Sequence, residues 1–404
     1  MKRAALVVAV SAAILIIAGF SLLSFFPLGQ NAVSPLTASP VAEVPQNATS
    51  AAKFGSVTNL TENPDDSVYG QVSAAGDKVY MVWQESVVGG NYDIFVKSSR
   101  DRGGIFENNT VNLSNNTGFS EHPQLAVSGN NTYVVWADDS SGRREILFAK
   151  SADGASYSEP TTLSNSDDSY NVELATFGSS VYLVWQEDKA IIFRASHDGG
   201  KTFDAPVVIA NNADLNSYPK VAAYDNAVHI VWSVADESAL FYVESSDRGG
   251  TFSDPAKLNG DMDTGEAQVV AYKEDVHVVW SGLHGAEIDD LLYTRSDDGG
   301  ETFARPVPIG IQDPLNAELA VMPLAGEQYA IHVASQVVLS PQNHEIVLAS
   351  SMDGGRTFAK PANLSNNPGI SECPTISISG NEIYVAWEDM TTGNHEILYA
   401  RGGL

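Results

Sequence analysis

The sequence contains a single cysteine, Cys373, among its 404 residues. No intrachain disulfide can therefore form, and the fold must be held together by its own core. Hydrophobic residues make up 43% of the chain, which is enough to bury such a core. We expect Cys373 to be a small buried residue rather than a reactive thiol.

Basic residues are also scarce. The chain has 22 lysines and arginines against 50 aspartates and glutamates, which gives a formal net charge of −28. A body of this charge repels nucleic-acid phosphates and anionic lipid headgroups, so we expect no nucleic-acid partner. Cationic partners, metal ions and neutral glycans are compatible with it.

Charge is absent from one long stretch near the N-terminus, residues 4–26, which follows Lys2 and Arg3. At about 1.5 Å per residue this stretch can cross a hydrocarbon core of about 30 Å. Residues 1–26 are predicted to be an N-terminal membrane anchor, with a cleaved signal peptide as the alternative. Residues 27–54 read as a flexible linker and 55–404 as the folded domain. We therefore predict a single-pass protein with residues 55–404 outside the cell, or alternatively a secreted one, which touches the membrane only through this segment.

All six tryptophans end the same apolar pattern, of which VYMVW at Trp83 and IYVAW at Trp387 are examples. A seventh copy, QYAIH, places His332 at the tryptophan position, so we expect His332 to be a core histidine. Each copy belongs to a unit of about fifty residues that holds four short strands separated by glycine- or asparagine-containing turns. Repeated four-stranded units of this kind are typical of a β-propeller, and the count predicts seven blades.

A second motif lies between the third and fourth strands of most units and follows the pattern S-x-D-x-G-x-T-F, as in SHDGGKTF at 196–203. We expect its aspartate to accept backbone N–H bonds across the turn. The motif resembles the Asp box of the sialidase, or BNR-repeat, superfamily, and the repeats cover 55–404. The six aspartates are Asp101, Asp153, Asp198, Asp247, Asp298 and Asp353.

The resemblance implies a propeller that is typically six-bladed, so a six-bladed sialidase-like fold is the alternative to seven blades. The last unit stops after three strands, whereas SVTNLT at 56–61 resembles a fourth strand. The sequence therefore predicts an all-β, seven-bladed propeller of four-stranded antiparallel blades, the last of which is closed by the N-terminal strand.

The resemblance also implies that ligands bind on the face opposite the Asp boxes, where the loops are acidic. Sialidases hold the substrate carboxylate with three arginines, but only Arg143 and Arg144 fall on this face. We therefore interpret the chain as a monomeric, non-catalytic propeller that binds a surface protein or a glycan, and Tyr218, Glu121 and the two arginines are the ligand-binding candidates. A sialidase-like glycoside hydrolase is the alternative.

Three further groups carry possible chemistry. Glu173 and Glu318 begin inner strands and are catalytic candidates if the chain is a hydrolase. Asp261, Asp263 and Glu266 cluster in one loop and could bind Ca²⁺; no other cofactor is expected. His344 and His395 begin equivalent third strands, where solvation at a strand edge is the default and metal binding is the alternative.

Overall fold

The computed structural model describes residues 52–404 except 212, 215, 216, 285 and 286, and the side chains of 283–289 are not described. The chain separates into two units, 1–46 and 47–404, and only the second contains described residues. The predicted anchor and most of the predicted linker lie outside this part. Within it, no helix has the length and apolar character needed to cross a membrane.

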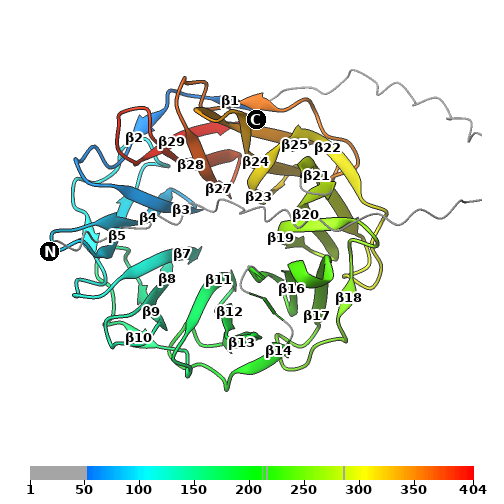
Figure 1. Ribbon diagram of the computed structural model, residues 1–404, viewed down its shortest axis with the longest axis horizontal. Helices are drawn as coiled ribbons and strands as arrows, with labels where there is room; N and C mark the ends of the chain where they lie inside the picture. Colours follow the sequence, from blue (N-terminus) through cyan, green and yellow to red (C-terminus); the bar gives the residue numbers. More distant parts are fainter. Residues whose placement is uncertain (1–51, 212, 215–216, 285–286) are drawn as a thin grey trace, which may run out of the picture. The chain divides into compact units, whose positions relative to one another are not determined.

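Seven antiparallel sheets form a ring around a central axis (Figure 1). The first strand of each sheet lies nearest the ring centre, and successive strands follow outwards. The seven-bladed prediction is confirmed, and the six-bladed alternative is wrong.

Blades 1 to 6 are meanders of four strands in chain order, and blade 7 has three such strands completed by N-terminal ones. Among the described residues, one 3-10 helix, η1 (Ala235–Glu237), interrupts blade 4. Blades 1 to 3 contain β3 (Ser67–Ala75), β4 (Lys78–Ser86), β5 (Tyr92–Ser99) and β6 (Val111–Asn112); β7 (Ser120–Ser128), β8 (Asn131–Asp138), β9 (Glu145–Ser151) and β10 (Thr161–Thr162); and β11 (Ser169–Phe177), β12 (Ser180–Glu187), β13 (Ala190–Ser196) and β14 (Val207–Ala210). Blades 4 and 5 contain β15 (Lys220–Tyr224), β16 (Ala227–Val234), β17 (Ala239–Ser245) and β18 (Ala256–Lys257); and β19 (Asp263–Tyr272), β20 (Asp275–His284), β21 (Glu287–Ser296) and β22 (Val307–Gln312). Blades 6 and 7 contain β23 (Pro314–Pro323), β24 (Tyr329–Ser340), β25 (Asn343–Ser351) and β26 (Ala362–Asn363); and β27 (Ser371–Ser379), β28 (Glu382–Asp389), β29 (Glu396–Gly403) and two short N-terminal strands, β1 (Lys53–Phe54) and β2 (Thr58–Asn59).

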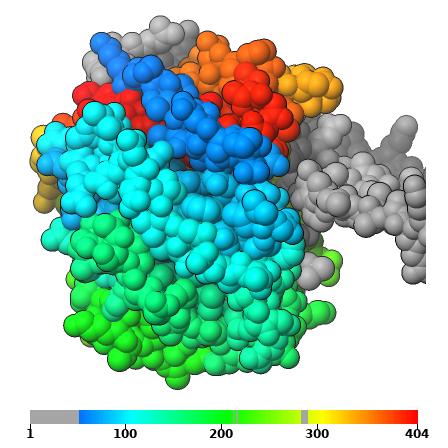
Figure 2. All heavy atoms as spheres, turned by 90° about the vertical axis from the view of Figure 1, so that its left-hand side faces the viewer, coloured from blue at the N-terminus to red at the C-terminus, as the bar shows by residue number. Residues whose placement is uncertain are grey.

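The N-terminal strands close the ring on the outer edge of blade 7. Thr58 and Asn59 pair with Tyr399 and Leu398 of β29, and β1 pairs with the end of the same strand. Figure 2 shows these first residues, in blue, packed against the last blade, in red. Leu60, which follows β2, is only 5% exposed. This closure covers an edge that would otherwise be free to pair with another chain.

The apolar second strand of each blade forms the core because both of its faces are covered by neighbouring strands and blades. All six tryptophans are at most 2% exposed, so the core lies between adjacent blades.

The tryptophan position of blade 6 differs from the prediction. In blades 1 to 5 the first residue of the apolar pattern pairs with the serine of the following S-x-D turn, and Ile331 takes this place opposite Ser351 in blade 6. Ser335, four residues later, therefore occupies the tryptophan position. His332 instead matches His229 of blade 4, whose Nδ1 lies 2.8 Å from Tyr242 Oη. His332 is fully buried, its Nδ1 lies 2.8 Å from Ser350 Oγ, and burial lowers its pKa to about 4.

The S-x-D turns are locked by their own side chains. In the turn at Asp198, the carboxylate accepts the N–H groups of Lys201 and Thr202 and the hydroxyls of Ser196 and Thr202. Ser196 Oγ in turn accepts the N–H of Gly200 at 2.9 Å. These bonds satisfy the polar groups of a tight turn without any ligand, and the other five turns repeat the serine–aspartate contact.

Candidate functional site

The inner strands share a β-bulge near their first residues. Six of the seven show the register shift, for example between Glu121 and Gln124. In five of these blades a residue of the bulge other than glycine has a positive φ, and in blade 4 Tyr218 has one at the corresponding place before β15. Bulges redirect side chains and are frequent beside functional sites. We call these six residues with positive φ the bulge residues: Tyr69, His122, Asn171, Tyr218, Asn316 and Cys373.

Bulge residues contact those of neighbouring blades, so they gather around the ring centre. The rings of Tyr69 and His122 lie 4.2 Å apart in an edge-to-face arrangement. Asn316 Nδ2 lies 3.4 Å from Cys373 Sγ. Burial lowers the pKa of His122 to about 4, so this imidazole is neutral at physiological pH.

The residue after the tryptophan position holds several of these bulges from the preceding blade. Gln84 Oε1 accepts the N–H of His122 at 2.8 Å, and Gln336 Oε1 accepts that of Cys373 at 3.4 Å. In blade 7 the corresponding residue is Glu388, whose Oε1 accepts the N–H of Tyr69 at 2.7 Å. A glutamate thus stands where blades 1 and 6 use an uncharged glutamine.

A second set of polar residues lies two positions beyond the bulge, and we call it the central row. Each member pairs with the residue immediately before the tryptophan position. Neighbours within the row are bonded to one another between blades: Lys220 to Glu173, Gln268 to Glu318, and Thr375 to Gln71. The central row consists of Gln71, Gln124, Glu173, Lys220, Gln268, Glu318 and Thr375.

Three glutamates from different blades, two of them in the central row, converge on Lys220. Burial alone would lower the pKa of Lys220, but the carboxylates of Glu173, Glu318 and Glu266 raise it. Burial raises the pKa of Glu318 to about 8 against the opposing charge of Lys220, and it also raises that of Glu266. Because these groups come from blades 3 to 6 and still act on one another, they lie together at the ring centre. The two catalytic candidates, Glu173 and Glu318, are both part of this group.

The arginine candidates are paired within a loop contact between blades 2 and 3. Arg143 Nη1 lies 3.0 Å from Asp167 Oδ1, and Arg144 Nη1 lies 3.6 Å from Asp168 Oδ1. Of the other ligand-binding candidates, Tyr218 has a positive φ just before β15, and Glu121 precedes the bulge of blade 2, where burial raises its pKa. The structure thus places Tyr218 and Glu121 near the ring centre and ties both arginines to acidic partners.

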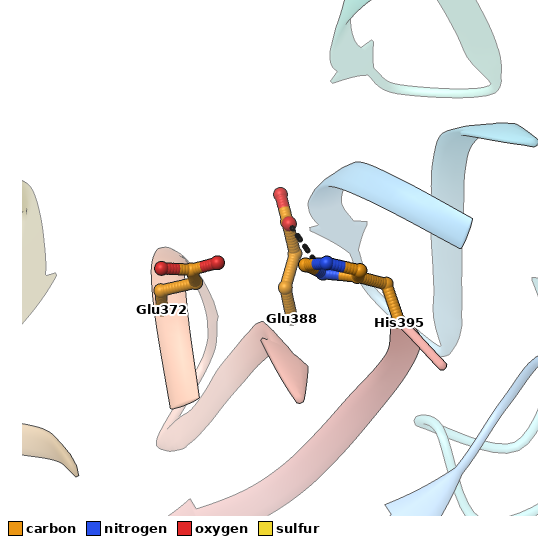
Figure 3. Close-up of side chains that lie close together, drawn as sticks. All are labelled: Glu372, Glu388 and His395. Carbon is orange, nitrogen blue, oxygen red and sulfur yellow. Dashed lines mark ion pairs between the residues drawn. The ribbon is translucent and has the colours of Figure 1, made fainter. Parts of the chain in front are cut away.

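The predicted calcium loop does not assemble. Asp261 is exposed before β19, whereas Glu266 lies within β19 and belongs to the group around Lys220. Among the described residues, the ligand atoms of Asp261, Asp263 and Glu266 do not meet within 4.8 Å. The group of three that does so consists of Glu372, Glu388 and His395 (Figure 3).

The fold is similar to those of several solved structures. A polysaccharide lyase, a PL25 ulvan lyase bound to -[GlcA(1-4)Rha3S]-, is 11% identical over 83% of this chain and 93% of its own, with a TM-score of 0.54. A protein of unknown function from Dyadobacter fermentans is 14% identical over 87% and 99%, with a TM-score of 0.52. Trypanosoma rangeli sialidase is 12% identical over 83% of this chain, with a TM-score of 0.48, and the match spans about half (55%) of its length. No family model and no curated protein sequence matches the chain. At these identities the first two matches, whose TM-scores exceed 0.5, show a shared fold.

Proposed function

We propose that this chain is a cell-surface propeller, anchored by residues 1–26, that binds an uncharged or amino-bearing glycan at its ring centre without cleaving it. The observation that carries the proposal is the convergence of Glu173, Glu266 and Glu318 on Lys220. Carboxyl and amide groups in such a row can bond sugar hydroxyls and ammonium groups, and they disfavour anionic sugars.

The charge arrangement sets this site apart from one for acidic sugars. A carboxylate or sulfate needs unpaired, preferably bidentate, cations. In the described part of the chain, the arginines of the acidic loops are paired with Asp167 and Asp168, and the lysine of the central row is paired with Glu173. The ulvan lyase match supports a glycan as the class of ligand, while these contacts favour a glycan of different charge.

Calorimetric titration of the full chain in detergent micelles tests this proposal. The probes are oligomers of glucosamine, of N-acetylglucosamine and of a glucuronic-acid-containing sugar. We expect binding of at least one of the first two and none of the acidic probe. Glu318→Gln should change the affinity, whereas Glu327→Gln, the same substitution at an exposed site of the same blade, should not. Tighter binding of the acidic oligomer, or equal binding by wild type and Glu318→Gln, would contradict the proposal.

A glycoside hydrolase is the second candidate, and one observation favours it. The pKa of Glu318 is raised to about 8, so this carboxyl group holds its proton at neutral pH. Glu173, in contrast, forms an ion pair with Lys220. Carboxyl groups whose environments differ in this way suit acid and base roles in glycoside cleavage. The test is cleavage of aryl glycosides. If the wild type releases the aryl group and Glu318→Gln does not, the chain is a hydrolase rather than a binding protein.

A further inference from the structure

We propose that Glu372, Glu388 and His395 bind a divalent transition-metal ion in blade 7, beside its contact with blade 1. Glu372 lies in β27, Glu388 in β28 and His395 directly before β29. Figure 3 shows the Glu388 carboxylate between the other two side chains. One ligand atom from each residue lies within 4.8 Å of the others. The inference is independent of the proposed glycan site.

The identity of Glu388 is the first argument. Its structural task is to accept the N–H of the bulge in the next blade, and the amides of Gln84 and Gln336 perform the same task. A carboxylate is therefore unnecessary for the fold, and it is costly because Glu388 is only 4% exposed. The second carboxylate oxygen faces His395, so the additional charge would stabilise a metal ion held between these two side chains.

The geometry around that second oxygen is the next argument. Glu388 Oε2 and His395 Nδ1 form an ion-pair contact at 3.6 Å (Figure 3), which is too long for a hydrogen bond. This buried Nδ1 has no hydrogen-bond partner in the structure. Metal–nitrogen and metal–oxygen bonds of about 2.0–2.2 Å place two ligands of a tetrahedral ion roughly 3.4 Å apart. The observed separation therefore fits two ligands of one ion better than it fits a hydrogen bond.

The surroundings supply partners that orient the ligands. His344 Nδ1 lies 3.9 Å from Glu372 Oε2 and 3.0 Å from Gln336 Nε2. The backbone N–H of His395 donates to Asp66 Oδ1 at 3.0 Å, which fixes the start of β29 against blade 1. Hydrogen bonds and charged contacts to metal ligands hold such ligands in place.

The donor set indicates the class of ion. One imidazole and two carboxylates suit Zn²⁺, Mn²⁺ or Fe²⁺ better than Ca²⁺, which takes six to eight oxygen ligands. Three protein ligands leave at least one coordination position for water or for a ligand. We use Zn²⁺ as the probe because it readily accepts four ligands.

The test uses the full chain, stripped with a chelator, loaded with Zn²⁺ and desalted. We expect one Zn²⁺ to remain per chain and the melting midpoint to rise on loading. Glu388→Gln should retain the metal-free melting midpoint, because glutamine serves in this position elsewhere, but it should lower Zn²⁺ affinity at least tenfold. His395→Gln should lower the affinity similarly.

The matched control is His197→Gln, since His197 lies in an S-x-D turn and pairs with Asp204 at 3.3 Å. It should bind Zn²⁺ as the wild type does. The proposal is overturned if the wild type retains no Zn²⁺, or if Glu388→Gln and His395→Gln bind it with unchanged affinity. Loss of affinity in His197→Gln to the same extent would also overturn it, because binding would then be nonspecific. Glycan binding is measured separately, so either proposal can fail alone.

Discussion

Replacing Leu60 with alanine should destabilise the propeller, because this residue joins the N-terminal strand to the core between blades 7 and 1. Leu60 is 5% exposed and packs in a cluster with Val72, Tyr384 and Ile397. Its backbone N–H also donates to Ile397 O at 2.9 Å, a bond that the substitution leaves in place. The change therefore isolates the side chain's contribution to closure.

The magnitude follows from the buried volume that is lost. Leu→Ala substitutions in cores cost about 2–5 kcal/mol, and a site at the edge of a cluster belongs near the lower end, at about 2–3 kcal/mol. Guanidinium unfolding followed by tryptophan fluorescence measures the change in the free energy of unfolding. Ile105→Ala is the control, because Ile105 is 74% exposed and its loss should cost at most about 0.5 kcal/mol. If Leu60→Ala is no more destabilising than Ile105→Ala, the N-terminal segment does not close the ring.

Three further substitutions test the turns and the ring centre. The pKa of Asp247 is lowered to about 2 by hydrogen bonds within its turn, so its stabilising effect is complete above about pH 4 and lost as the pH falls towards 2. Thermal melts should show less loss over that interval in Asp247→Asn than in wild type, and equal losses would refute the locking role. The pKa of Glu318 is instead raised from 4.5 to about 8, so the folded chain binds the extra proton and stability falls as the pH rises through this interval. Glu318→Gln should flatten that fall, and an unchanged slope in chemical unfolding would show that Glu318 is ionised in the fold. Gly300→Ala should cost about 1–3 kcal/mol more than Gly299→Ala, because both residues have positive φ but only a Cβ at Gly300 meets Tyr242 Oη, at 1.7 Å. Equal midpoints for the two variants would contradict this packing.

The blades could be predicted from the sequence because each depends on local signals. The apolar tryptophan strands, the turn residues and the S-x-D motif repeat within each unit, and the missing fourth strand of the last unit had a visible replacement at 56–61. The tryptophan position of blade 6 was misplaced by three residues, because neither candidate there is a tryptophan and apolar character alone does not fix register. Pairing of Ile331 with Ser351 settles it.

The sites depend on contacts between blades, which no local pattern encodes. Glu173 and Glu318 were candidates as strand-initial acids, but their meeting with Lys220 follows from the curvature of the ring. Glu388 is a glutamate after tryptophan, where two other units have the glutamines Gln84 and Gln186. The role of this position could not be read from the sequence. The structure shows it, because Gln84 accepts a backbone N–H from the next blade.

The most direct test of the proposed function is a crystal structure of the propeller with the oligosaccharide that binds in solution. We predict sugar density at the ring centre, in contact with at least one of Glu173, Lys220 and Glu318. A sugar bound at the S-x-D turns, with the ring centre empty, would contradict the assignment of the binding face.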